Sequence, residues 1–281
     1  MLLQLVVISA IVYVILYYLN VRRYPKGPFP LPLIGNIHQI KLDTFHHQLH
    51  EYSKQYGPCF TVFLPRPTVV FADYETVKEA LIQRDINHRA QLPPETLLQK
   101  ELQTGILIAD GEEKMREEIH AVVGKERQTV MTDKPQMPYF TAAIHEIQRK
   151  ANMIPFLGTH RSAEATTIAG HIIPKDTVTM PQIWSVMRED PVFADTDTFR
   201  PERFLEDDGK TINKKALERN IVFSIGKRAC VGEALARMEL FLILATLLQK
   251  YRFEPTEPID FTPVFSAVLV PRLYKCRIVP V

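Results

Sequence analysis

The chain has 281 residues, of which 46% are hydrophobic, and its formal net charge is +2. A chain of this length can bury a substantial core in one or two domains. A charge this close to neutral gives no reason to expect a nucleic-acid partner, so we expect none. The three cysteines, Cys59, Cys230 and Cys276, are an odd number and lie far apart, which argues against a disulfide framework and favours a reducing compartment.

The first predicted element is an apolar helix. Residues 2–19 contain no charged residue and are long enough to cross a membrane, although as a short helix. Arg22, Arg23 and Lys26 follow this run and no lysine or arginine precedes it, so the positive-inside rule places the rest of the chain in the cytosol. A cleaved signal peptide is the alternative, but its charges would lie on the other side and no small-residue cleavage site follows the run. We therefore predict an uncleaved transmembrane anchor over residues 1–20.

A proline-rich connector is predicted next, over residues 21–36. Pro25, Pro28, Pro30 and Pro32 fall close together in it. Proline fixes φ and removes an amide donor, so this stretch cannot be helical and should be stiff and extended. The connector therefore separates the membrane segment from a folded part that begins at residue 37.

The folded part begins with a pattern typical of an α+β protein. Residues 46–55 have the spacing of an amphipathic helix, and two β-rich runs at residues 60–64 and 68–72 predict a hairpin. Asp73 is placed to cap the helix that follows. Many α+β proteins would begin in this way, so these elements alone do not indicate a function.

The second half of the chain is predicted to be mainly helical. Residues 138–150 form a helix with proline in its first turn, and residues 233–250, free of proline and glycine, form a long, mostly buried helix. A hairpin is predicted over residues 166–180, with its turn at Pro174–Thr177. Closing strands are predicted within residues 269–279. The fold class is therefore mainly α with a smaller β part.

The helix at residues 138–150 carries Glu146 and Arg149, which are three residues apart and so share one face. An exposed ion pair is the ordinary interpretation of such a spacing, and it would contribute little stability. Phe140 and Ile144 make the surrounding face apolar, so we predict that the pair is partly buried.

The loop at residues 223–232 carries the chemistry that the sequence makes visible. Cys230 lies at the start of the long helix, where free amides and the positive end of the macrodipole favour a thiolate. Gly226 and Gly232 allow backbone amides to approach the sulfur. One cysteine without a histidine does not complete a structural zinc site. A single thiolate with Arg228 beside it suits a planar, anionic, iron-bearing ligand, although a buried structural cysteine is the plainer alternative.

The spacing Phe-x-x-Gly-x-Arg-x-Cys-x-Gly closely resembles the haem-binding loop of the cytochrome P450 superfamily, here most like a microsomal, family-two member. The resemblance implies that the cofactor is haem (iron protoporphyrin IX) and that Cys230 is the axial thiolate ligand of its iron. It further implies that Phe223 packs over the proximal face, that Gly226 shapes the loop, and that Arg228 pairs with a haem propionate. His160 matches another propionate contact, for which a hydrogen-bonded structural histidine is the equal alternative.

A second family signature is resembled by residues 199–204, Phe-Arg-Pro-Glu-Arg-Phe. In that family the glutamate and arginine of the first motif interlock with the arginine of the second. The resemblance thus implies a structural triad of Glu146, Arg149 and Arg203 that holds the cysteine loop and takes no part in chemistry. The proline-rich connector likewise resembles the hinge of microsomal members.

The resemblance breaks near Glu113. Residues 105–113 resemble the segment before helix C of the family, whereas residues 114–124 resemble helix J, which lies far downstream. The part left out holds helices C to I, including the oxygen-activating helix, and the chain has no Ala-Gly-x-x-Thr pattern. We interpret the sequence as an internally deleted form whose incomplete P450 domain joins residues 37–113 to residues 114–281. A splice product and a faulty gene model are both open. The loss should expose apolar faces of the two long helices.

The family resemblance implies a haem-thiolate monooxygenase that inserts one oxygen atom from O2 into an apolar small molecule, such as a foreign compound or a lipid. Electrons would come from NADPH through NADPH–cytochrome P450 reductase, with cytochrome b5 as a further candidate partner, at the endoplasmic reticulum membrane. No catalytic residue is assigned, because the oxygen-activating helix is missing, and impaired activity is expected. The alternatives are a non-catalytic truncated isoform or fragment that binds haem weakly or not at all, and a thiol enzyme with Cys230 as nucleophile.

Overall fold

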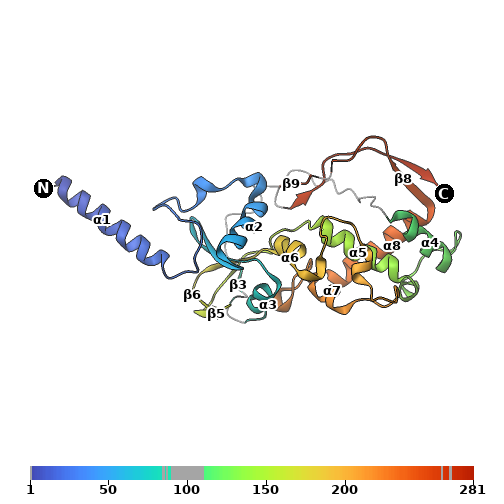
Figure 1. Ribbon diagram of the computed structural model, residues 1–281, viewed down its shortest axis with the longest axis horizontal. Helices are drawn as coiled ribbons and strands as arrows, with labels where there is room; N and C mark the ends of the chain where they lie inside the picture. Colours follow the sequence, from blue (N-terminus) through green and yellow to red (C-terminus); the bar gives the residue numbers. More distant parts are fainter. Residues whose placement is uncertain (1, 84–85, 87, 90–110, 261, 266–267) are drawn as a thin grey trace. The chain divides into compact units, whose positions relative to one another are not determined.

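The computed structural model describes residues 2–83, 86, 88–89, 111–260, 262–265 and 268–281 (Figure 1). Residues 105–110, the first part of the 105–113 segment before the break in the family resemblance, therefore lie outside the described residues. The chain forms two compact units, each built from separate stretches. The first unit comprises residues 1–94, 155–186 and 225–228, and the second comprises residues 95–154, 187–224 and 229–281.

Helix α1, Leu2–Val21, is the N-terminal element of the first unit (Figure 1). It contains no charged residue, and most of its residues are apolar. Its window Gln4–Val21 has a mean hydropathy of 2.0 and none of it is buried. The helix therefore has the length and composition that the predicted membrane anchor requires.

Removing residues 1–20 should shift most of the protein from the membrane fraction to the soluble fraction, because the apolar helix is lost. A smaller part should stay with membranes, since Phe29 and Leu33 in the connector keep exposed apolar side chains. Fractionation of cells that express the full and the shortened chain, followed by an alkaline wash, measures the shift. A soluble full-length protein, or a mature chain that begins after Leu19, would refute the anchor.

The connector is fixed to the first strand of the domain by Asn36. The Asn36 amide donates to the Phe63 carbonyl at 2.9 Å, and the Phe63 amide donates to Asn36 Oδ1 at 2.9 Å. Asn36 Nδ2 also donates to the Pro28 carbonyl at 3.2 Å. Gly35 adopts a φ of 58°, and a Cβ atom there would lie 2.3 Å from the Phe63 carbonyl oxygen, so only glycine fits.

The first unit is built on a five-stranded sheet in the order β1-β2-β7-β4-β3. The predicted hairpin is present as β1, Cys59–Leu64, paired antiparallel with β2, Arg66–Phe71. Strand β7, Val178–Pro181, pairs parallel with β2. The order is completed by β4, His160–Arg161, and β3, His88–Arg89.

The hairpin predicted over residues 166–180 is wrong in its turn and its second strand. Strand β5, Thr166–Ile168, pairs with β6, His171–Ile173, and the chain turns at Ala169 and Gly170, whose φ values are 48° and 75°. Gly170 adopts this left-handed conformation without a Cβ clash, which favours a tight hairpin turn. The predicted turn at Pro174–Thr177 instead leads into β7.

Two helices flank this sheet within the first unit. Helix α2, Phe45–Tyr56, supplies Leu49 to a buried cluster with side chains from β1, β2 and β7. Helix α3, Tyr74–Ile82, begins as predicted, because the Thr76 amide donates to Asp73 Oδ1 at 2.8 Å. Short 3-10 turns precede α2 at Ile37–Gln39 (η1) and Leu42–Thr44 (η2).

The second unit is mainly helical. Its helices are α4 (Glu112–Val122), η5 (Met131–Gln136), α5 (Pro138–Ala151), η6 (Pro191–Phe193), η7 (Pro201–Phe204), α7 (Lys214–Arg219) and α8 (Glu233–Lys250). Helix α6, Ile183–Glu189, joins the two units in sequence, and η8, Gly226–Arg228, belongs to the first. Strand β8, Tyr251–Pro255, pairs with β11, Cys276–Pro280, and β9, Val264–Phe265, pairs with β10, Leu269–Val270. The predicted class, mainly α with a smaller β part, is confirmed.

Helix α8 is less buried than predicted. Its buried residues lie in the C-terminal half, from Phe241 to Gln249, whereas Leu235 is 56% exposed and Met238 is 40% exposed. The prediction of a mostly buried helix is therefore wrong for the N-terminal half. Helix α5 behaves differently: the apolar side chains of Phe140 and Ile144 are buried, so the expected exposure of that helix is not found.

Candidate functional site

Glu146 lies at the centre of a buried charge cluster in the second unit. Helix α5 places it three residues before Arg149, whose Nε and Nη2 atoms donate to the two carboxylate oxygens at 2.7 and 2.9 Å. Arg203 from η7 brings its Nε to 3.1 Å from Glu146 Oε2, an ion-pair contact without hydrogen-bond alignment. The side chains are 0% exposed for Glu146 and 1% exposed for each arginine. The three residues of the predicted triad thus lie together.

The remaining N–H groups of Arg149 and Arg203 donate mainly to backbone carbonyls within residues 187–198. Arg149 donates to the Met187 carbonyl at 3.0 Å and to the Thr196 carbonyl at 2.7 Å. Arg203 donates to the Ala194 carbonyl at 2.5 Å. Burial lowers the pKa of Arg203, and the neighbouring Glu146 carboxylate opposes this effect. Because its charges and donors are largely satisfied, the cluster is suited to hold backbone segments in place.

The cysteine loop lies between this cluster and α8 in the sequence. The Cys230 amide donates to the Phe223 carbonyl at 2.8 Å, which closes the loop, and α8 begins at Glu233. Ser224 and Gly226 have φ values of 66° and 74°. Cys230 is exposed.

The five residues predicted to contact haem are divided between the two units. Phe223 and Cys230 belong to the second unit, whereas Gly226, Arg228 and His160 belong to the first. His160 is buried in strand β4, opposite Thr179 of β7. Gly226 lies against α3, where an added Cβ atom would be 2.5 Å from the Leu81 carbonyl oxygen. The predicted contacts with haem propionates stay predictions.

Arg237 on α8 was not among the residues predicted from the sequence, but it makes three side-chain contacts. Its Nε donates to Glu233 Oε1 at 2.8 Å, its Nη1 lies 3.1 Å from His145 Nδ1, and its Cζ lies 5.0 Å from the Phe223 ring centroid. The spacing of Glu233 and Arg237, four residues apart on a helix, could have indicated the ion pair. No pattern in the sequence indicates the contact with His145.

His145 is held neutral in this setting. Burial, the Arg237 charge and the Lys134 charge lower the pKa of His145 from 6.5 to about 3. Because an arginine can only donate, the Nδ1 atom of His145 must accept from Arg237.

Acid should therefore destabilise the second unit through His145. Below about pH 6.5 the unfolded chain binds a proton that the folded protein excludes, so the free energy of unfolding falls by up to about 1.4 kcal/mol per pH unit. The contribution of His145 to the free energy of unfolding is constant above about pH 6.5 and declines as the pH falls from there towards about 3. Urea unfolding between pH 7 and 4 measures the slope. His145→Gln should reduce the slope, and exposed His171→Gln should not; equal slopes in all three proteins would contradict the assignment.

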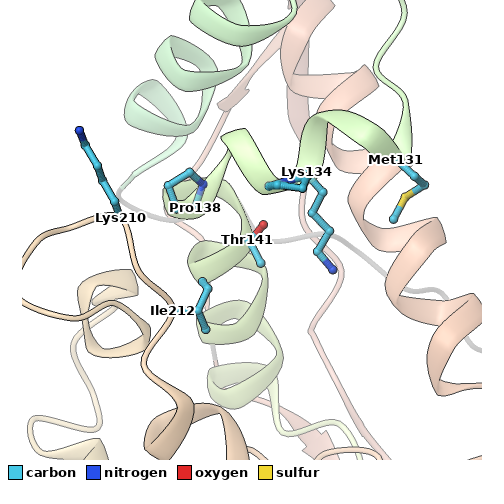
Figure 2. Close-up of a pocket in the computed structure, with 7 residues that line it drawn as sticks. Met131, Lys134, Pro138, Thr141, Lys210 and Ile212 are labelled. Atoms are coloured by element: carbon cyan, nitrogen blue, oxygen red, sulfur yellow. The ribbon is translucent and has the colours of Figure 1, made fainter.

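A hollow of about 310 Å³ lies elsewhere in the second unit (Figure 2). Its lining residues come from η5, the start of α5 and a loop: Met131, Lys134, Pro135, Pro138, Thr141, Lys210 and Ile212. Burial, together with the Arg237 charge, lowers the pKa of Lys134. None of the predicted haem contacts lines this hollow.

The donor set at Cys230 fits a metal centre that needs one soft donor from the protein. In the part of the chain that the structure describes, no group of three or more His, Cys, Asp or Glu side chains could hold a bare metal ion. An iron ion that brings its own equatorial ligands needs only one protein thiolate. The predicted haem is therefore chemically compatible with the single exposed thiol of Cys230.

Comparison with known proteins gives a consistent result. A sequence profile of the family Cytochrome P450 matches residues 25–115 and 110–277. Cytochrome P450 1A2 of Oryctolagus cuniculus is 42% identical over 158 residues, which is 56% of this chain and 31% of that protein. Cytochrome P450 2U1 of Homo sapiens is 40% identical over 172 residues, 60% of this chain and 31% of that protein. Cytochrome P450 2E1 of Mus musculus is 40% identical over 173 residues, which is 60% of this chain and 34% of that protein. The matches thus span about a third of the length of these relatives.

Proposed function

The chain belongs to the cytochrome P450 family, and on that premise we propose that it is a shortened haem-thiolate monooxygenase in which Cys230 is the ligand of the haem iron. The observation that carries the proposal is the exposed thiol of Cys230 in a loop closed by the bond from its own amide to the Phe223 carbonyl. When bound, haem supplies the oxygen chemistry.

The protein's own residues would hold the cofactor and protect its surroundings. Cys230 would donate its thiolate at the start of α8, where the macrodipole favours negative charge. Phe223 would cover one side of the macrocycle, and Arg228 and His160 would pair with its propionates. The cluster around Glu146 would keep the preceding chain segment in place, so that the loop presents the sulfur in one position.

We place this protein at the endoplasmic reticulum membrane, anchored by α1, with the bulk of the chain in the cytosol. Arg22 and Arg23, which follow α1 directly, support that orientation. Electrons would come from NADPH through NADPH–cytochrome P450 reductase, with cytochrome b5 as a second donor. The substrate would be an apolar small molecule that partitions into the membrane.

An internal deletion is part of the proposal. The two stretches matched by the family profile overlap at residues 110–115, and the aligned part of the chain covers only about a third of the length of each relative. The exposed apolar side chains of Leu235 and Met238 are those expected where neighbouring helices have been lost. Without a distal wall the site would neither exclude water nor position a substrate.

A non-catalytic role is the second candidate, and the same exposed face of α8 favours it. Such a protein would hold haem weakly or not at all. A thiol enzyme that uses Cys230 as its nucleophile would need a nearby base, and no histidine occurs in the loop at residues 223–232 or in α8.

The full chain should show little or no monooxygenase turnover even when it contains haem, because the distal part of the site is missing. The test reconstitutes the protein with reductase and NADPH and follows product formation from several apolar substrates, with an intact microsomal P450 as control. Product formation at the rate of the control would refute the impairment. A preparation made with excess haem that contains none would refute the haem-binding role itself.

A further inference from the structure

Arg237 makes three contacts within the second unit, one of them with Phe223 at the start of the cysteine loop. It lies on the second turn of α8, four residues after Glu233, and its Nε donates to Glu233 Oε1 at 2.8 Å. Its guanidinium carbon lies 5.0 Å from the centre of the Phe223 ring, which is the range of a cation–π contact. The Arg237 side chain is 21% exposed, so water weakens these contacts only in part.

The third contact joins the Arg237 guanidinium to His145. His145 Nδ1 lies 3.1 Å from Arg237 Nη1 and comes from α5, the helix that also carries the buried Glu146 cluster. Asn220, just before the cysteine loop, donates through Nδ2 to the His145 carbonyl at 3.1 Å. His145 of α5 therefore binds both Arg237, through its ring, and the chain just before the cysteine loop, through its carbonyl.

Phe223 transmits this constraint to the cysteine. Its carbonyl oxygen accepts the Cys230 amide at 2.8 Å, so the Phe223 backbone and the Cys230 backbone move together. A planar guanidinium against the ring restricts the Phe223 side chain from the side of α8. The fold therefore couples the second turn of α8 to the start of the loop.

We propose that Arg237 is a positioning residue, which holds the Phe223 end of the loop and thereby the direction of the Cys230 thiol. The proposal rests on the proposed function, since a fixed thiol direction matters for a single axial ligand. Arg237 would act through Phe223 and would not itself bind the iron.

The test measures hydrogen exchange of the Cys230 amide in the full chain in detergent micelles. Arg237→Met keeps the length of the side chain and removes its charge, and it should make this exchange roughly two- to fivefold faster, the factor that corresponds to a cation–π contact of about 0.5–1 kcal/mol. Arg237→Lys should restore part of the protection. Arg252→Met, on a half-exposed arginine of β8, is the matched control and should leave the Cys230 amide unchanged.

A double-mutant cycle separates positioning from general destabilisation. Phe223→Leu keeps an apolar side chain without a ring face, and its combination with Arg237→Met should accelerate exchange no more than either change alone. Additive effects, an unchanged Cys230 amide, or equal acceleration throughout α5 and α8 would overturn the proposal.

Haemin titration of the same proteins distinguishes this proposal from the proposed function. Weaker haemin binding in Arg237→Met than in the parent and in Arg252→Met supports both. If the parent binds no haemin while the exchange results hold, the proposed function fails and the positioning role stands. If the parent binds haemin and Arg237→Met binds it equally well with an unaltered spectrum, the positioning role for the ligand is refuted.

Discussion

Replacing Glu146 by alanine should destabilise the second unit by about 3–5 kcal/mol and greatly reduce the yield of folded protein. The carboxylate lies between Arg149 and Arg203, each with a side chain that is 1% exposed. Its removal leaves two guanidinium groups buried close together without a counter-charge. A loss of this size is a large fraction of the roughly 5–15 kcal/mol that stabilises a typical protein.

Glu202→Ala is the matched control for this prediction. Glu202 pairs with Lys114 at 2.8 Å, but both side chains are about half exposed, so the loss should be at most about 1 kcal/mol. Arg149→Ala and Arg203→Ala should resemble Glu146→Ala in direction. Urea unfolding and the yield of monodisperse protein measure the effects. If Glu146→Ala unfolds at the same urea concentration as Glu202→Ala, the cluster does not hold the fold together.

Replacing Cys230 by alanine should abolish thiolate-ligated haem, because it removes the soft donor at the start of α8. Neither of the other cysteines is an equivalent substitute. Cys59 is buried, and burial raises the pKa of its thiol to about 12. Cys276 is a half-buried residue of strand β11.

Cys276→Ala is the control for that experiment and should bind haem as the parent does. The haem content and the absorption spectrum of all three purified proteins are compared after expression with the same haem supply. A Cys230→Ala protein with the parent's spectrum would show that another residue ligates the iron.

Local patterns in the sequence predicted the regular elements well where periodicity was strong. Helix α8 has the predicted bounds, and the hairpin of β1 and β2 lies where its β-rich runs indicated. The error at residues 166–180 arose because Pro174 signals a turn more strongly than the pair Ala169 and Gly170, where the chain turns. The left-handed conformation at Ala169 is not visible in its residue type.

Burial and long-range contacts were harder to predict. The apolar residues of α8 have the composition of a core helix, but which of its halves is covered depends on what packs there. The Glu146 cluster was predictable only because two motifs resembled a known family. The contact between His145 and Arg237 joins residues 92 positions apart in sequence, and neither residue type indicates the other.

The absorption spectrum of the reduced full chain with carbon monoxide tests the central claim most directly. The proposed function predicts that the protein, purified in detergent after expression with added haem precursor, shows the red-shifted Soret band of a thiolate-ligated iron. The exposed Cys230 thiol in its closed loop is the basis for that expectation. A protein without haem absorbance, or one whose Soret band is that of a histidine-ligated iron, would contradict it.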